Sequence, residues 1–159
     1  MAENTAEGAA IDDRPDLAAM IVPLGRTLMA VELPVLRDHG LSMWAYSVLL
    51  ALGEEPVRTQ NALAQAIGAD KTRIIGVLDD LEERALIERR RDPGDRRVRL
   101  LSLTPEGGRL RASARAAIRE QENRLLAHLP GDERTAFLRA LRTLSTLPEE
   151  TVVPSGEDR

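Results

Sequence analysis

The chain has 159 residues, 43% of them hydrophobic and 30% charged, which is enough for one globular domain with its own hydrophobic core. It has no cysteine and only two histidines, which excludes disulfides, thiolate zinc sites and thiol-based redox sensing, and we expect neither a metal nor another cofactor. Its continuous apolar runs are far shorter than the roughly 18 residues of a membrane span, and residues 1–15 show no export signal, so we expect a cytoplasmic protein with no membrane partner.

The positive charge is concentrated in one short segment. The formal net charge is −4, yet residues 17–147 hold 20 basic and 17 acidic residues, because both tails are acidic. The segment from Arg84 to Arg99 alone has seven arginines against three acidic residues. Electrostatic binding depends on local charge, so the acidic total does not exclude a nucleic acid as partner.

Residues 1–14 are predicted to be a disordered lead-in, and a long helix follows them. Over residues 15–39 the apolar side chains recur at three- and four-residue steps, which is the helical period. Pro23 and Pro34 lie inside this stretch, so we expect a kink or a break near one of them. Gly40 is predicted to end the helix.

A second helix is predicted from a cap at Ser42 to about Leu52. The residues Gly53–Pro56 favour a turn, and Val57-Arg58 is predicted to be a short strand. Thr59 can then cap the helix that follows.

Two short helices joined by a glycine come next. Gly68 suits the joint because glycine tolerates the left-handed backbone conformation, and Asp70 is a cap for the second of the two helices. The apolar residues of that second helix recur at i, i+4 and i+7 as Ile74, Leu78 and Leu81. Two short helices with a tight glycine turn are the helix-turn-helix pattern.

The period then changes from helical to two, which predicts a hairpin. Leu86–Arg91 and Arg97–Leu103 are the two predicted strands, and Asp92–Asp95 is the four-residue loop between them. Thr104 and Pro105 suit the cap and the first position of a long helix.

That helix is predicted to run from Pro105 to about His128, and a last helix from about Asp132 to Leu147. The elements predict a mainly α fold with a small β-hairpin wing (α+β). We expect residues 53–103 to form a winged helix-turn-helix domain, with helical regions at 15–52 and 104–147 on either side of it in the chain. Residues 148–159 are expected to be a loose acidic tail.

Such a fold offers two probes for double-stranded DNA. The second helix can lie in the major groove, and the hairpin tip can reach a minor groove, whose narrow stretches attract arginine. Gly76 in that helix either allows close approach to DNA or is a tolerated imperfection. At the tip, Asp95 either holds the guanidinium of Arg97 in one orientation or forms a salt bridge that only stabilises the hairpin.

Several motifs give the chain a specific resemblance. The matching stretches are Leu63-Ala64, Ile67-Gly68, Leu81-Glu82-Glu83-Arg84, Leu86-Ile87-Glu88-Arg89, Asp92-Pro93-Gly94-Asp95-Arg96-Arg97 and Leu103-Thr104-Pro105-Glu106-Gly107. On these residues the chain resembles the MarR family (multiple antibiotic resistance regulators). The resemblance implies a homodimer in which the helices of residues 15–52 and 104–147 form the dimerisation region. Each subunit then offers one winged domain to half of a palindromic operator.

The resemblance also assigns roles to residues. It implies that Arg97 enters the minor groove with support from Asp95, and that the reading helix spans Asp70 to Arg84. The residues expected to contact DNA are Thr59, Asn61, Lys71, Thr72, Arg73, Ile75, Gly76, Arg89, Arg90, Arg96 and Arg97.

Two departures from the family pattern stand out. Family members usually have glycine where this chain has Ala85, and alanine would be strained in the left-handed conformation, so we expect this helix end to close differently. Ile75 and Gly76 replace residues that are often polar or basic, which shifts the expected specificity toward Lys71, Thr72, Arg73 and DNA shape.

Many relatives are released from DNA by small aromatic or anionic compounds, and the resemblance implies such an effector here. Trp44 lies in the segment that lines the relatives' ligand region, and His39 and Arg26 are expected nearby. Trp44 is alternatively a core or interface aromatic, and His39 alternatively interacts with the helix dipole.

The sequence thus predicts a sequence-specific DNA-binding transcriptional regulator, a repressor released by a small ligand. The alternative is a winged-helix protein-interaction module without operator binding. An enzyme is not expected, because no phosphate-binding glycine loop and no nucleophile elbow is present.

Overall fold

In the computed structural model of the chain, residues 15–54, 58–95 and 97–148 are described. They fall in two compact units, Met1–Arg119 and Glu120–Arg159. The predicted lead-in, Val57, Arg96 and the tail after Pro148 lie outside the described residues.

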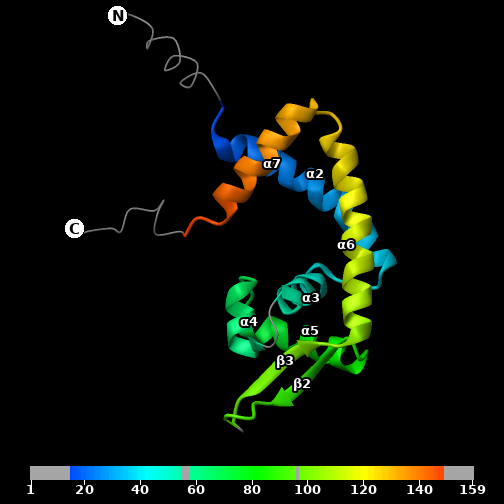
Figure 1. The fold of residues 1–159 in the computed structure, drawn as a ribbon, viewed down its shortest axis with the longest axis vertical. Coiled ribbons are helices and arrows are strands. Elements are labelled where there is room, and N and C mark those ends of the chain that lie inside the picture. Colours follow the sequence, from blue (N-terminus) through cyan, green and yellow to red (C-terminus); the bar gives the residue numbers. More distant parts are fainter. Residues whose placement is uncertain (1–14, 55–57, 96, 149–159) are drawn as a thin grey trace, which may run out of the picture. The chain divides into compact units, whose positions relative to one another are not determined.

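The elements confirm the predicted mainly α fold with a small hairpin (Figure 1). In chain order they are α2 (Leu17–Asp38), α3 (Met43–Glu54), β1 (Arg58–Thr59), α4 (Gln60–Ala66), α5 (Lys71–Glu83), β2 (Ile87–Arg91), β3 (Arg99–Leu103), α6 (Pro105–Leu126) and α7 (Gly131–Ser145). The first unit holds α2 to β3 and most of α6, and the second unit holds the end of α6 and α7.

The helix α2 is unbroken, so of the kink or break predicted near one of its prolines the break is wrong, while the kink stays a prediction. Pro23 and Pro34 both lie inside the helix, and both are exposed. A proline ring leaves the carbonyl one turn before it without a hydrogen-bond donor. On an exposed helix water can satisfy that carbonyl, and the helix continues through both positions.

The same helix is more apolar than the short runs of the sequence indicate. An 18-residue window of α2 has a mean hydropathy of 1.5, and only 6% of that window is buried, so the helix is long and apolar enough to cross a membrane by length and composition. Its apolar residues are interrupted by Pro23, Arg26 and Glu32, so no uninterrupted run in the sequence reveals it. One such helix near an N-terminus is weak evidence for a span, because core helices and signal sequences meet the same criteria.

The predicted helix caps are confirmed. The side chains of Ser42, Thr59, Asp70 and Thr104 each accept a backbone N–H from the first turn of the helix that follows. The helix α3 extends to Glu54, two residues beyond its predicted end.

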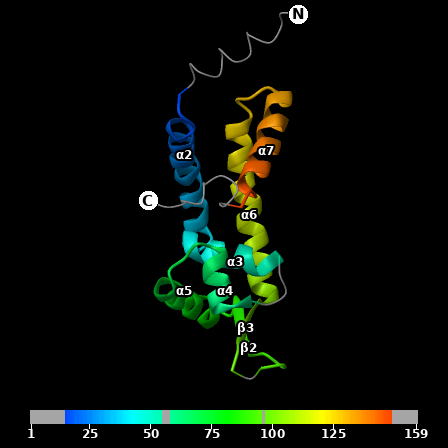
Figure 2. The same cartoon turned by 90° about the vertical axis from the view of Figure 1, so that its left-hand side faces the viewer.

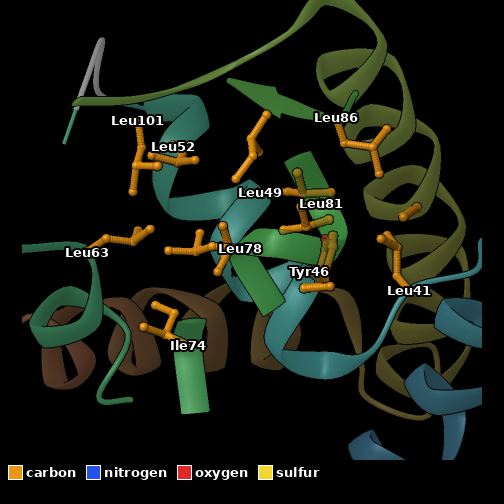
Figure 3. Close-up of a cluster of buried hydrophobic side chains, with 14 of the residues drawn as sticks. Leu41, Tyr46, Leu49, Leu52, Leu63, Ile74, Leu78, Leu81, Leu86 and Leu101 are labelled. Carbon is orange, nitrogen blue, oxygen red and sulfur yellow. The ribbon is translucent and has the colours of Figure 1, made fainter. Parts of the chain in front are cut away.

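The core of the first unit is a single apolar cluster contributed by α2 to α6. The predicted inward residues of α5, Ile74, Leu78 and Leu81, are at most 1% exposed, as expected. In Figure 3 Leu63 of α4 lies beside Ile74 and Leu78, with Leu49 of α3 next to them. This cluster fixes α5 against α3 and α4 and leaves the opposite face of α5 outside.

The hairpin belongs to an antiparallel sheet with the strand order β1-β3-β2. Seven residues, 92–98, connect β2 to β3, so the predicted four-residue loop is too short. The reason is that two aspartates bend the chain in succession. The carboxylate of Asp92 accepts the N–H of Gly94 at 2.7 Å, and that of Asp95 accepts the N–H of Arg97 at 3.0 Å. The hairpin extends beyond α4 and α5 in both views of the molecule (Figures 1 and 2).

Three helices of the first unit end in the left-handed conformation. Gly40 after α2 and Gly68 after α4 both have φ +64°, and Ala85 after α5 has φ +55°. The predicted strain on this alanine is therefore present. The prediction that the helix would close differently is wrong, because the backbone adopts the glycine-like conformation despite the side chain.

The bonds around Ala85 show why this conformation persists. The N–H of Leu86 donates to the carbonyl of Leu81, and the N–H of Ala85 donates to that of Glu82, both at 2.9 Å, which together form the Schellman motif. The hydroxyl of Thr104 donates to the carbonyl of Ala85 at 2.7 Å. The end of α5 is thus fixed from two sides.

In the second unit, Arg134 joins the end of α6 to α7. Its guanidinium donates to the carbonyls of Leu126 at 3.1 Å and Leu129 at 3.4 Å. The helix α7 has no buried residue, and its leucines at 138, 141 and 144 are 44–62% exposed.

Candidate nucleic-acid interface

The first turn of α5 is organised by Asp70. Its carboxylate accepts the N–H of Thr72 at 2.7 Å and also the Thr72 hydroxyl. The hydrogen bond from this hydroxyl, and then that from the N–H, holds the pKa of Asp70 below its ordinary value of 3.8. The cap therefore stays ionised near neutral pH and fixes where the helix begins.

The outer face of the first half of α5 carries the residues predicted to read DNA. Thr72, Arg73, Ile75 and Gly76 are all exposed, on the side away from the core residues. Lys71 is the first residue of α5, and its side chain lies outside the described part of the structure.

Arg73 and Trp44 form a contact between α5 and α3. The guanidinium carbon of Arg73 lies 5.7 Å from the centre of the Trp44 ring, within the range of a cation–π interaction. Trp44, for which the sequence left open a ligand pocket or a core or interface position, therefore contacts a residue predicted to bind DNA.

The other two residues predicted to line that pocket have different surroundings. His39 Nδ1 lies 2.7 Å from the carbonyl of Val35, and its Nε2 lies 3.1 Å from the hydroxyl of Ser113. Arg26 is exposed on α2. Over the described part of the chain, no hydrogen bond or ion pair joins Arg26, His39 and Trp44 to one another.

Arg89, which is predicted to contact DNA, forms two ion pairs that the sequence did not predict. Its side chain is only 16% exposed, and its guanidinium forms ion pairs with Asp79 at 2.7 Å and with Glu82 at 2.8 Å. Both carboxylates belong to α5, whereas Arg89 belongs to β2. Arg89 therefore joins the wing to the reading helix and neutralises two of the acidic residues of that helix.

The support of Arg97 by Asp95 also differs from the prediction. Asp95 accepts the backbone N–H of Arg97, and in the described ranges no ion pair joins its carboxylate to the Arg97 guanidinium. Asp95 thus shapes the backbone of the wing tip, and the Arg97 side chain is exposed there. Arg90 is exposed on β2 and forms an ion pair with Glu88 at 2.7 Å, and Asn61 is exposed on α4.

An open pocket of about 250 Å³ lies between the reading helix and the wing. It is lined by Gln60, Ile75, Asp79, Arg89, Arg99 and Leu101. The sequence analysis did not single out Gln60, Asp79 or Arg99. The period of two along β3 is the sequence signal that could have placed Arg99 and Leu101 on one face. The pairing of Asp79 with Arg89 could not have been predicted, because it depends on the packing of β2 against α5. Within the described ranges no group of three or more His, Cys, Asp or Glu side chains is placed to hold a metal ion.

A capped helix with an exposed polar face, beside a hairpin with an arginine at its tip, defines a winged helix-turn-helix protein. A sequence profile described as the MarR family matches residues 39–98. The chain is 33% identical over 113 residues to a putative transcriptional regulatory protein for the hcr operon of Thauera aromatica, covering 71% of this chain and 68% of that protein. The chain belongs to the MarR family of transcriptional regulators.

Two further relatives agree with this assignment. The transcriptional regulator HosA of Escherichia coli O111:H- is 31% identical over 99 residues, which cover 62% of this chain and 73% of that protein. The solved structure of the transcriptional repressor CouR, bound to a 23-mer DNA duplex, is similar with a TM-score of 0.72 and 29% identity, covering 91% of this chain and 99% of that one.

Proposed function

We propose that the protein is a homodimeric repressor that binds a palindromic operator and is released from it by a small molecule. The observation that carries the proposal is that Arg89 forms ion pairs with both Asp79 and Glu82. These ion pairs join the wing to the reading helix α5, the two elements that would contact DNA. A reading helix and a wing held in fixed relation can enter adjacent grooves together. The similarity to CouR, which is bound to DNA, supports the same use of the fold.

The dimer is supported by apolar surface that the single chain leaves in water. The helix α2 has six large apolar residues that are 40–57% exposed: Leu17, Met20, Ile21, Val22, Met29 and Leu33. The helix α7 adds Leu138, Leu141 and Leu144. Large apolar side chains left exposed along a helix mark an association site, and a second copy of the chain offers the same side chains in return. A two-fold protein then requires a palindromic operator.

The pocket between α5 and the sheet supports release by a ligand. It lies at the joint between the two probes, and its lining includes the apolar Ile75 and Leu101 and the exposed cation Arg99. The carboxylate of Asp79 also lines it, but this charge is offset by the ion pair with Arg89, so the lining has a net positive charge. A small aromatic anion suits that combination. Thermal unfolding with a panel of aromatic carboxylates would detect it, because a ligand that binds the folded state raises the melting temperature.

The proposal assigns no catalytic role to any residue, and it places the protein in the cytoplasm with its DNA. It also gives the apolar surface of α2 a protein partner, with no membrane needed.

DNA binding is tested by selecting bound sequences from random duplexes and by measuring affinity against salt. We expect a palindromic consensus and a steep loss of affinity with rising salt. Arg97→Ala should weaken binding by more than about 1 kcal/mol and leave the dimer intact on size-exclusion chromatography. Arg119→Ala, at an exposed position of α6, is the matched control and should bind as the unchanged protein does. Sequence-blind binding that ignores salt would favour the alternative, a protein-interaction module.

A further inference from the structure

Ile75 is an aliphatic side chain in the middle of the surface proposed to face DNA. It is 45% exposed, whereas Ile74 beside it in the sequence is 1% exposed in the core. A β-branched residue is also a weak helix former. Neither the core nor the helix therefore explains why isoleucine stands at this position.

The polar side chains one turn before and after Ile75 are already engaged. Thr72 donates its hydroxyl hydrogen to Asp70. Asp79 accepts from the guanidinium of Arg89 at 2.7 Å. Neither Thr72 nor Asp79 thus has a free hydrogen to donate to a base, and Ile75 is the central group between them.

Gly76 is the next residue along this face, and the fold does not require it. A Cβ atom built at this glycine would meet nothing within 4 Å. Glycine in a helix interior is destabilising relative to alanine. Gly76 therefore lowers the stability of α5, and no packing contact requires a glycine there. Its effect is to let another molecule approach the α5 backbone beside Ile75 more closely.

The charge along α5 confines DNA contact to its first two turns. The second half of the helix holds four acidic residues, Asp79, Asp80, Glu82 and Glu83, which repel phosphates where they are not neutralised. In helix-turn-helix proteins the N-terminal residues of the reading helix contact the base edges. Ile75 lies within that N-terminal half.

We infer that Ile75 reads the C5-methyl group of a thymine in the major groove, with Gly76 giving the helix room to approach. Thymine is the one base that presents a methyl group there, whereas the other bases are distinguished by their donors and acceptors. Isoleucine against a methyl group buries apolar area, whereas isoleucine against a polar edge leaves that edge without water or partner. Ile75 would thereby select a thymine at one position of each half-site. The inference rests on the proposed operator binding.

The test replaces thymine by deoxyuridine in the operator selected with the full chain. Deoxyuridine lacks the methyl group and keeps every hydrogen-bonding group of the base. Each thymine of the half-site is replaced in turn, in both half-sites together, and affinity is measured by fluorescence anisotropy. Burial of one methyl group changes a binding constant about fourfold, so we expect one position where the replacement weakens binding about fifteenfold.

The variants Ile75→Ala and Ile75→Val assign that effect to the side chain. In Ile75→Ala the loss at this position should shrink to less than about twofold, while losses at other thymines stay unchanged. Ile75→Val should give an intermediate loss, which keeps the test valid if the alanine variant binds too weakly to measure. Replacing the thymine by 5-methylcytosine should cost the unchanged protein less than replacing it by cytosine.

Two results would overturn the inference, and they differ from each other. A selection that recovers no consensus contradicts the operator-binding proposal itself. A clear consensus with no deoxyuridine effect, or with the same effect in Ile75→Ala, contradicts only the role of Ile75.

Discussion

Ala85→Gly is expected to stabilise the protein. Ala85 has φ +55°, and the left-handed conformation costs a residue with a Cβ about 1–2 kcal/mol. Glycine removes that cost, but its greater freedom in the unfolded chain offsets about 0.4–1 kcal/mol of the gain. The hydrogen bond from Thr104 to the carbonyl of Ala85 holds the backbone, so relaxation to another conformation is not expected. The net effect should be about 1 kcal/mol of added stability.

The assay is urea unfolding followed by circular dichroism, together with thermal melting. A gain of about 1 kcal/mol should raise the melting temperature by about 2–4 °C in a protein of this size. All variants must be compared at one protomer concentration, because unfolding of a dimer depends on concentration.

The matched control for this prediction is Ala116→Gly. Ala116 is exposed and lies inside α6, where glycine is about 1 kcal/mol less favourable than alanine. The same chemical change should therefore stabilise at position 85 and destabilise at position 116. Loss of stability at both positions would refute the strain attributed to Ala85.

Three further predictions concern α5. Gly76→Ala should raise folding stability by about 1 kcal/mol while weakening operator binding; a gain in both would contradict the close approach proposed at this glycine. Arg89→Met should lower the free energy of unfolding by about 1–2 kcal/mol, because two carboxylates lose their partner, whereas the exposed control Arg90→Met should change it by less than about 0.5 kcal/mol. Thr72→Val should raise the pKa of Asp70 in an NMR titration, since it removes the hydroxyl bond that lowers that pKa. An unchanged titration in the variant would refute the Thr72 hydroxyl as the cause of the lowered pKa. Stabilisation by the ionised cap is present above the ordinary pKa of 3.8 and is lost as the pH falls through the lower folded value.

The features predicted correctly depend on residues that are close together in the chain. A helix cap is decided within three residues, and so Ser42, Asp70 and Thr104 could be assigned from the sequence alone. The turn at Gly68 likewise follows from the backbone freedom of one residue. The hydrophobic period along α5 then places its inward face.

The features predicted incorrectly depend on surroundings that the sequence does not display. Pro34 leaves α2 unbroken because that part of the helix is exposed. Ala85 takes the left-handed conformation because the bonds of the helix end and of Thr104 outweigh its strain. The ion pairs of Arg89 were not predicted, because its carboxylate partners lie seven and ten residues away on a different element; its DNA contact stays a prediction. The period of two along β2 places Arg89 and Arg90 on opposite faces, but it does not show which of the two faces the carboxylates of α5.

The short reading segment of α5 limits how much sequence one subunit can specify. The residues Lys71–Gly76 span about 9 Å of helix, which is about three base pairs of DNA. Two subunits thus read about six base pairs, and a given six-base-pair combination occurs by chance about once in 4,000 base pairs. A genome offers about 10⁶ or more competing sites, so the two helices alone would match hundreds of sites in it. Selecting one gene requires further information from the wing tips, the half-site spacing and the bendability of the DNA between them.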